Sequence, residues 1–136
     1  MASIIRETVI DADPADVWTA LADFGAVHQR LVPGFVVASV LDGPGTRVVT
    51  FFNGVVAREI LVGIDEDAHR LAYSVVDGLP ATHHNASAQV VALGESRSKF
   101  VWITDVLPDE LAGGIGEQMD RGIGVIKQTL EAAARP

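Results

Sequence analysis

The chain has 136 residues, of which 49% are hydrophobic and 21% charged, and its formal net charge is -8. We expect one folded domain over residues 1–136, and the acidic balance disfavours binding to nucleic acid or to an anionic membrane surface. Because cysteine is absent and no signal peptide or long apolar run is recognised, we expect a soluble cytoplasmic protein without disulfides, thiolate metal sites or a membrane span.

The first quarter of the chain predicts a strand followed by two short helices. The strand is the alternating segment Ser3–Asp11. Asp13 is the expected N-cap of the first helix, with Pro14 at the first helical position, where its missing N–H costs nothing. A second short helix is predicted over Ala26–Leu31 and ends before Pro33-Gly34.

The middle of the chain alternates between short apolar runs and turn residues. Spacing of this kind is typical of strands joined by tight turns, and it predicts a meandering antiparallel sheet. The predicted strands are Phe35–Leu41, Arg47–Phe52, Val56–Ile64, Arg70–Val76, Thr82–Leu93 and Lys99–Leu107.

The last segment changes to a helical period. From Asp109, the predicted N-cap, apolar residues recur at helical spacing for about 25 residues. The sheet needs a cover for its apolar face, and this helix is the candidate, so the fold class is α+β. The helix holds five glycines, which either allow close packing against the sheet or leave an internal space. They are Gly113, Gly114, Gly116, Gly122 and Gly124.

Three segments resemble the START-like superfamily, the group of the polyketide cyclases and the birch pollen allergen. They are "ADPADVWTALADFG" (Ala12–Gly25), "NG…REILVGID…LAYSVVD" (Asn53–Asp77) and "FVWITDVLP" (Phe100–Pro108). The chain is most similar to the bacterial polyketide cyclase/dehydrase type, and distantly to plant lachrymatory factor synthases. The resemblance implies the helix-grip fold, a seven-stranded antiparallel sheet wrapped around a long C-terminal helix, with two short helices after the first strand. It also implies a cavity between sheet and helix for small hydrophobic molecules, and no particular reaction.

Alternation along the strands assigns side chains to the cavity. Tyr73, His84, Phe100 and Trp102 fall on the apolar inner faces of their strands, and His83 on the outer face. The stretch "VAREILVGID" is ambiguous, because either Arg58 or Glu59 must point inward. The resemblance favours Glu59 inward and Arg58 in water. The predicted ligand-binding residues are Leu61, Tyr73, Phe100, Trp102 and Met119.

Three residues are candidates for catalysis. The resemblance to lachrymatory factor synthases matches Glu59 with their cavity carboxylate, His84 with a functional tyrosine, and Arg47, one residue out of step, with their cavity arginine. Each also has a structural interpretation. Glu59 is then a partly buried carboxylate tied to Arg47 or Tyr73, and His84 is a hydrogen-bonded cavity histidine. For Arg47 the favoured interpretation is a solvated strand charge.

Two functions remain open from the sequence. The favoured one is the binding of a small hydrophobic molecule, polyketide- or lipid-like, in the cavity. The alternative is a cofactor-independent cyclase, dehydratase or isomerase in which Glu59 and His84 meet and transfer protons. No cofactor or metal is expected, since His83 and His84 diverge from one strand and no third ligand is suitably spaced. The sequence leaves the oligomeric state open.

Overall fold

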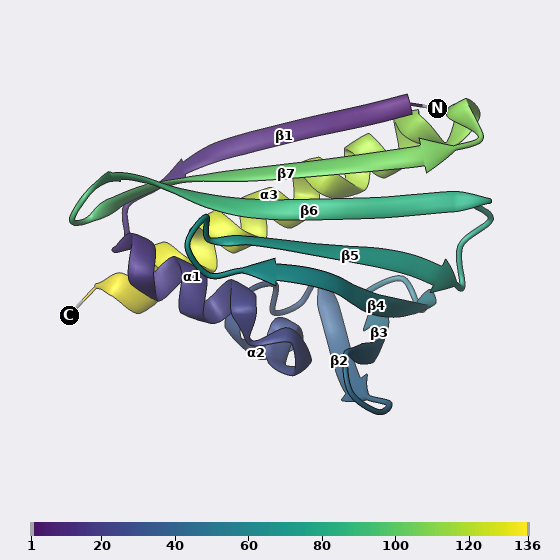
Figure 1. Ribbon diagram of the computed structural model, residues 1–136, viewed down its shortest axis with the longest axis horizontal. Coiled ribbons are helices and arrows are strands. Elements are labelled where there is room, and N and C mark those ends of the chain that lie inside the picture. The colour runs from purple at the N-terminus through teal and green to yellow at the C-terminus, as the bar shows by residue number, and fades with distance from the viewer. Residues whose placement is uncertain (1, 136) are drawn as a thin grey trace.

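The computed structural model, described over residues 2–135, is a strongly curved antiparallel sheet with a long helix along its open side (Figure 1). The seven strands are ordered β1-β7-β6-β5-β4-β3-β2, and every neighbouring pair is antiparallel. The strands are β1 (Ala2–Ile10), β2 (Val36–Leu41), β3 (Thr46–Phe51), β4 (Val56–Asp65), β5 (Arg70–Asp77), β6 (His83–Gly94) and β7 (Arg97–Leu107). The predicted helix-grip architecture is confirmed.

The helices occupy the two places that the sequence indicates. Helix α1 (Pro14–Ala22), the 3₁₀ turn η1 (Phe24–Ala26) and α2 (Val27–Arg30) follow β1, and η2 (Asp109–Leu111) with α3 (Ala112–Ala134) ends the chain. The predicted cap of α1 is confirmed, because the Asp13 carboxylate accepts the N–H of Ala15 over 2.9 Å. Asp109 is not the cap of α3: the 3₁₀ turn intervenes, and Leu111 takes that position.

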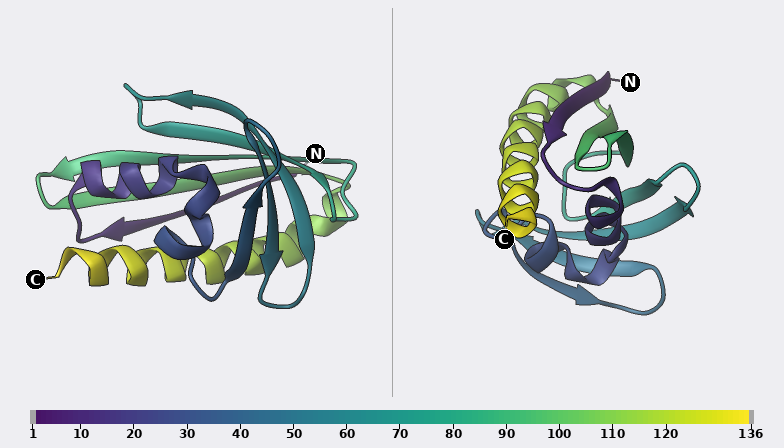
Figure 2. Two further views of the ribbon diagram at one scale, coloured as in Figure 1. Left: turned by 90° about the horizontal axis from the view of Figure 1, so that it is seen from below. Right: turned by 90° about the vertical axis from the view of Figure 1, so that its left-hand side faces the viewer.

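Helix α3 is fixed to β1 at its C-terminal half. Lys127 Nζ donates to the carbonyl of Val9 over 2.5 Å and to Glu131 Oε2 over 2.8 Å. The same carboxylate oxygen accepts the N–H of Asp11 over 2.9 Å, and these two donors hold the pKa of Glu131 below its usual range. The views in Figure 2 show α3 running beside β1 along the open side of the curved sheet.

The glycines of α3 divide into two kinds. A Cβ on Gly122 would lie 3.0 Å from the Trp102 ring and 3.3 Å from Phe35, so this glycine allows close packing of helix on sheet. A Cβ on Gly116 would meet the end of the Arg6 side chain at 2.8 Å, on β1. The remaining three, Gly113, Gly114 and Gly124, have open space beside them. Close packing therefore explains Gly122, and none of the five by itself creates an internal space.

Trp18 docks α1 on the turn between β4 and β5. Its Nε1 donates to Glu66 Oε2 over 2.7 Å, and its ring stacks on His69 with the ring centres 5.2 Å apart. His69 has a φ of 51°, a left-handed conformation that non-glycine residues seldom adopt. This arrangement closes one end of the curved sheet, so that the space under the sheet lies toward α2, β2 and α3. Within residues 2–135, no helix is both long and apolar enough to cross a membrane.

Candidate functional site

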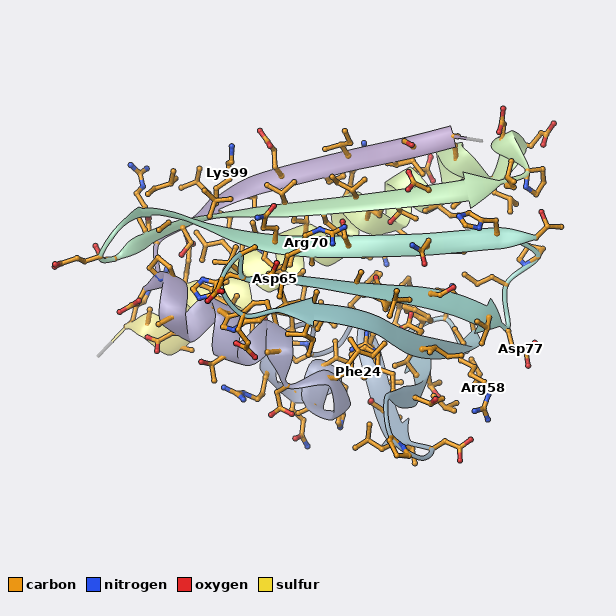
Figure 3. The ribbon with its side chains drawn as sticks, viewed as in Figure 1. Phe24, Arg58, Asp65, Arg70, Asp77 and Lys99 are labelled. Atoms are coloured by element: carbon orange, nitrogen blue, oxygen red, sulfur yellow. The ribbon has the colours of Figure 1, made fainter. Side chains whose placement is uncertain are left out.

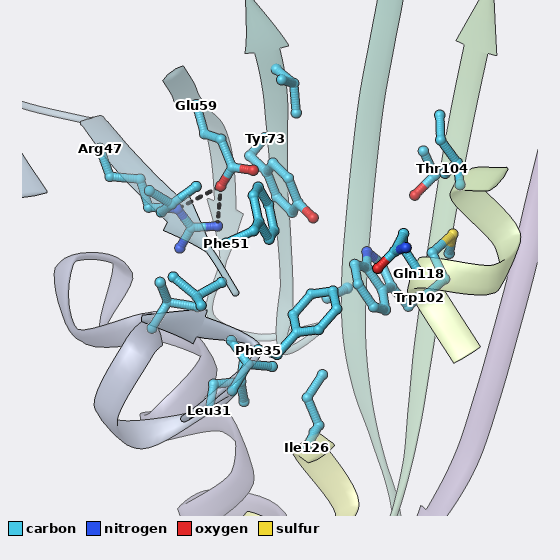
Figure 4. A pocket seen from close by; sticks show the side chains of 18 of the residues that line it. Leu31, Phe35, Arg47, Phe51, Glu59, Tyr73, Trp102, Thr104, Gln118 and Ile126 are labelled. Carbon is cyan, nitrogen blue, oxygen red and sulfur yellow. Dashed lines mark hydrogen bonds and ion pairs between the residues drawn. The ribbon is translucent and has the colours of Figure 1, made fainter. Parts of the chain in front are cut away.

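A cavity of about 200 Å³ lies between the inner face of the sheet and α3 (Figure 4). Strands β3 to β7 form its floor, and the segment from α1 to the start of β2 closes one side. Its walls are mainly apolar, with a few polar side chains. Those polar residues are Arg47, Asn53, Glu59, Tyr73, His84, Thr104 and Gln118.

Glu59 points inward and Arg58 points outward, as predicted. The Glu59 residue is 5% exposed and lines the cavity. Arg58 pairs with Asp42 over 2.7 Å at the rim of the sheet, and Figure 3 shows its side chain directed away from the molecule. A buried carboxylate requires a partner, because desolvation of a charge costs several kcal/mol.

The partner of Glu59 is Arg47, which is buried rather than solvated. The favoured sequence interpretation of Arg47 is therefore wrong. The two residues are directly opposite one another on β3 and β4, and both the Nε and the Nη2 of Arg47 lie 2.7 Å from Glu59 Oε1. The remaining guanidinium nitrogen, Nη1, donates to the carbonyl of Phe24 over 3.0 Å. The Glu59 carboxylate, the backbone carbonyl of Phe24 and the Phe24 ring together stabilise the buried charge of Arg47.

Aromatic rings enclose the guanidinium. The Arg47 Cζ lies 3.8 Å from the centre of the Phe24 ring and 5.2 Å from that of Tyr73. A cation over a ring face is attracted by the ring quadrupole, by about 0.5–2 kcal/mol depending on desolvation. Each of the three guanidinium nitrogens of Arg47 therefore lies near a protein oxygen, and both contacts with Glu59 are made to its Oε1.

Tyr73 stands beside this ion pair with its hydroxyl toward the cavity (Figure 4). Burial raises the pKa of its phenol well above the usual range, and the negative charge of Glu59 adds to the rise. The positive charge of Arg47 and a hydrogen bond from Trp102 act in the opposite direction on this pKa. The phenol therefore stays protonated throughout the physiological range and can donate to a ligand.

His84 lines the cavity from β6, and His83 is exposed on the opposite face, as predicted. Desolvation lowers the pKa of the His84 imidazole to about 4, and the nearby His83 adds to the lowering. Its Nδ1 is buried and has no hydrogen-bond partner among the described residues. At neutral pH, His84 is an uncharged ring with an unused polar atom.

Glu59 and His84 do not meet, which corrects the predicted contact. Glu59 lies opposite Val75 on β5, and continuing the register of β5 with β6 places Val75 opposite His84. Two strand spacings of nearly 5 Å therefore separate their backbones by about 10 Å. Parity gave the face of His84 and the resemblance that of Glu59, but the strand that separates them follows only from the sheet order.

Four of the five predicted ligand-binding residues line the cavity. Tyr73, Phe100, Trp102 and Met119 line the cavity, whereas Leu61 does not. Leu61 shares the inner face with Glu59 but packs against the main hydrophobic core, which fills the sheet at that end. Some of the residues that sequence reasoning missed come from the segments around α2 and the start of β2, where periodicity is too short to show a face. They include Val27, Leu31, Val32 and Phe35, with Val49 and Phe51 from β3 and Ile115, Gln118 and Ile126 from α3.

The donor set of the site suits organic ligands better than a metal ion. No group of three or more His, Asp or Glu side chains able to hold a metal occurs within residues 2–135. The one carboxylate in the cavity is already bound to an arginine. The polar groups available to a ligand come from Glu59, Tyr73, His84, Asn53, Thr104 and Gln118, and the rest of the wall is mainly apolar.

A family model and several solved structures match the chain over nearly all of its length. Residues 1–134 match the model of the family described as polyketide cyclase / dehydrase and lipid transport. No curated protein matches the sequence. A protein of Thermobifida fusca, solved by solution NMR, is 31% identical over 93% of this chain and 91% of its own, with a TM-score of 0.77.

Two more distant structures share the fold. A START superfamily protein from Mycobacterium smegmatis has a TM-score of 0.76 at 14% identity, covering 97% of this chain and 96% of its own. The di-domain ARO/CYC protein BexL of the BE-7585A biosynthetic pathway has a TM-score of 0.86 at 13% identity, covering 100% of this chain and 48% of its own. The chain thus has the START-like fold and belongs to the polyketide cyclase / dehydrase and lipid transport family.

Proposed function

We propose that this protein binds a small hydrophobic molecule, polyketide- or lipid-like, in the cavity between the sheet and α3. The observation that carries the proposal is the cavity itself, about 200 Å³ of space under a sheet whose other inner positions are closely packed. A ligand in this space would remove the apolar walls from water, which is favourable.

The walls support the same proposal. Phe35, Phe100, Trp102 and Ile126 approach the space from both the sheet and the helix sides. Apolar walls with a few convergent polar groups are typical of small-molecule sites. The polar groups would fix the orientation of the ligand, and burial of its apolar surface would supply about 25 cal/mol per Å² of favourable free energy.

The test is displacement of a fluorescent probe. ANS should bind the purified native protein with a saturable rise in emission, and hydrophobic ring compounds should displace it. Native mass spectrometry of the protein as isolated should show any ligand that copurifies. If ANS does not bind the folded protein and no ring compound raises its melting temperature, the proposal is wrong.

An acid–base enzyme is the second candidate, and the free Oε2 of Glu59 favours it. A carboxylate held on one oxygen by Arg47 can accept a proton from a bound substrate on the other. Since His84 is too far to assist that carboxylate directly, its role would be to donate to an oxygen on which negative charge develops, as Tyr73 also could. Abstraction of a proton beside a carbonyl would give an enolate. Return of the proton at another carbon is isomerisation, loss of a β-hydroxyl as water is dehydration, and attack of the enolate on a second carbonyl of the same substrate, whose oxygen takes the proton, is cyclisation.

Hydrogen exchange on a small ketone tests this candidate without knowledge of the natural substrate. Acetophenone in D₂O loses a methyl proton to the base and regains a deuteron, which ¹H NMR records directly. The enzyme hypothesis expects faster exchange with the native protein and a loss of roughly 10²-fold in Glu59→Gln. Equal exchange rates with and without protein would favour a carrier.

A further inference from the structure

The two halves of α3 differ in what holds them to the sheet. We infer that the first half, residues 112–121, is a movable wall of the cavity. It detaches from β1 and β7 as one unit while the second half, residues 123–134, stays docked, and a bound ligand holds it closed. The separate movement stands on the fold alone, whereas its coupling to a ligand rests on the proposed function.

The halves belong to different hydrophobic clusters. Three residues of the second half are buried in the main core, which extends over α1, α2 and most of the sheet. They are Ile123, Ile126 and Leu130. The first half contributes Met119 to a much smaller cluster, whose other buried members are Ile4 of β1 and Val106 of β7. The first half can therefore leave the sheet without disrupting the main core.

The first half is also the intrinsically weaker helix. It contains Gly113, Gly114 and Gly116, and glycine in a helix costs stability relative to alanine because it loses more backbone entropy. Gly113 and Gly114 have open space beside them, so close packing does not offset that cost. Leu111, at the N-cap position, has no side chain that can hydrogen-bond to the first turn. Local opening is therefore easiest in this half.

The polar contacts of the two halves differ in the same direction. The second half is tied to backbone groups at the end of β1 and just after it. The first half is held at its surface, where Arg6 pairs with Asp120 over 2.5 Å and the Cζ of Arg121 lies 4.6 Å from the centre of the Phe52 ring. Both contacts are exposed to solvent, and exposed ion pairs and cation–π contacts contribute little to stability. They allow the first half to open.

The first half forms part of the ligand space. Ile115, Gln118 and Met119 line the cavity from this half, and the cavity is partly open to solvent (Figure 4). A ligand that contacts these side chains binds the closed form better than the open one. By linkage, such a ligand shifts the helix toward its closed form.

Hydrogen exchange of the native protein, read for each amide by NMR, tests the separate movement. The comparison is between amides 117–121 and amides 126–130, all of which lie well inside α3. After correction for intrinsic rates, the first group should exchange at least about tenfold faster, and its members should share one opening equilibrium. Equal protection in the two groups would overturn the inference. So would protection that rises residue by residue from the helix end, which is simple fraying.

Gly114→Ala and Gly124→Ala form a matched pair, because both glycines face open space on opposite sides of the boundary in one helix. Gly114→Ala stabilises the closed form alone and should slow exchange of amides 117–121 about two- to fivefold. Gly124→Ala should leave that exchange unchanged, since the second half is helical in both forms. Equal effects of the two variants would overturn the inference.

Arg121→Gln should act in the opposite direction. It removes the contact with the Phe52 ring and should accelerate exchange of amides 117–121 about two- to fivefold. Unchanged exchange in this variant would show that the contact does not hold the first half closed.

ANS tests the coupling to the cavity. At about ten times its dissociation constant, ANS should slow exchange of amides 117–121 about tenfold, because a ligand confined to the closed form suppresses opening in proportion to its saturation. Unchanged exchange with ANS bound would overturn the coupling and leave ligand binding intact. If ANS does not bind and amides 117–121 still open as one unit, the proposed function and the coupling fail while the separate movement stands.

Discussion

Nε and Nη2 of Arg47 each lie 2.7 Å from the same carboxylate oxygen, Oε1 of Glu59, inside the sheet. Both side chains are less than a tenth exposed. The arrangement buries a pair of charges and leaves the other carboxylate oxygen for the cavity. The contribution of this ion pair to the free energy of unfolding can therefore be tested separately from its contribution to ligand binding.

Breaking the pair from one side should destabilise the fold strongly. Arg47→Met leaves the Glu59 carboxylate buried without a cation, and we expect the free energy of unfolding to fall by about 3–5 kcal/mol in urea denaturation. The double variant Arg47→Met, Glu59→Leu should be more stable than Arg47→Met alone, because no uncompensated charge remains. Arg58→Met, at the exposed pair, should change stability by less than about 1 kcal/mol. Additive losses in the double variant would contradict this account of the pair.

Two glycines of α3 should respond oppositely to alanine. Gly124→Ala adds a methyl group to open space in the middle of a helix, so the free energy of unfolding should rise by about 0.5–1 kcal/mol. In Gly122→Ala the methyl group would press on Trp102 at 3.0 Å, and the displaced ring would narrow the cavity. We therefore expect Gly122→Ala to show no such rise in the free energy of unfolding and to bind ANS more weakly than the native protein. Unchanged ANS affinity in Gly122→Ala would show that the Trp102 wall does not bound the ligand space.

His84 should make stability depend on pH. Its folded-state pKa of about 4 lies below the ordinary value of 6.5, so between these pH values the unfolded chain binds more protons than the folded one. The folded state therefore loses stability as pH falls from 6.5 toward 4, and the loss is absent above 6.5. His84→Gln should reduce the fall between pH 7.5 and pH 5 by about 1 kcal/mol, after allowance for partial exposure.

The control for that experiment is the adjacent histidine. His83→Gln changes the exposed face of the same strand, and its stability difference between the two pH values should stay near that of the native protein. An identical pH dependence in native protein and His84→Gln would mean that the imidazole is solvated and does not lie under the cavity wall.

The sequence predicted the fold well because the signals that it used are local. Strand alternation and turn residues found all seven strands, and Asp13 with Pro14 located the start of α1. Asp109 was misassigned because a 3₁₀ turn and an α-helix begin with the same residue types. Such a boundary depends on backbone geometry that the pattern does not contain.

The site was predicted only in part, because it depends on contacts between distant segments. Parity placed His84 inward and the family resemblance favoured Glu59 inward, but the burial of Arg47 also involves the carbonyl of Phe24, 23 residues away. The separation of Glu59 from His84 likewise follows from β5 lying between β4 and β6. The volume of the cavity depends on the packing of Gly122 and Phe35, which no periodicity describes.

The two tryptophans allow a direct test of where a ligand binds. Trp102 lines the cavity, whereas Trp18 lies outside it, stacked on His69. The ¹H–¹⁵N spectrum of the native protein should contain two indole signals, which Trp18→Phe assigns by removing one. During titration with ANS the Trp102 indole signal should shift and saturate, and the Trp18 signal should stay in place. A shift of the Trp18 signal with the Trp102 signal unmoved would contradict ligand binding between the sheet and α3.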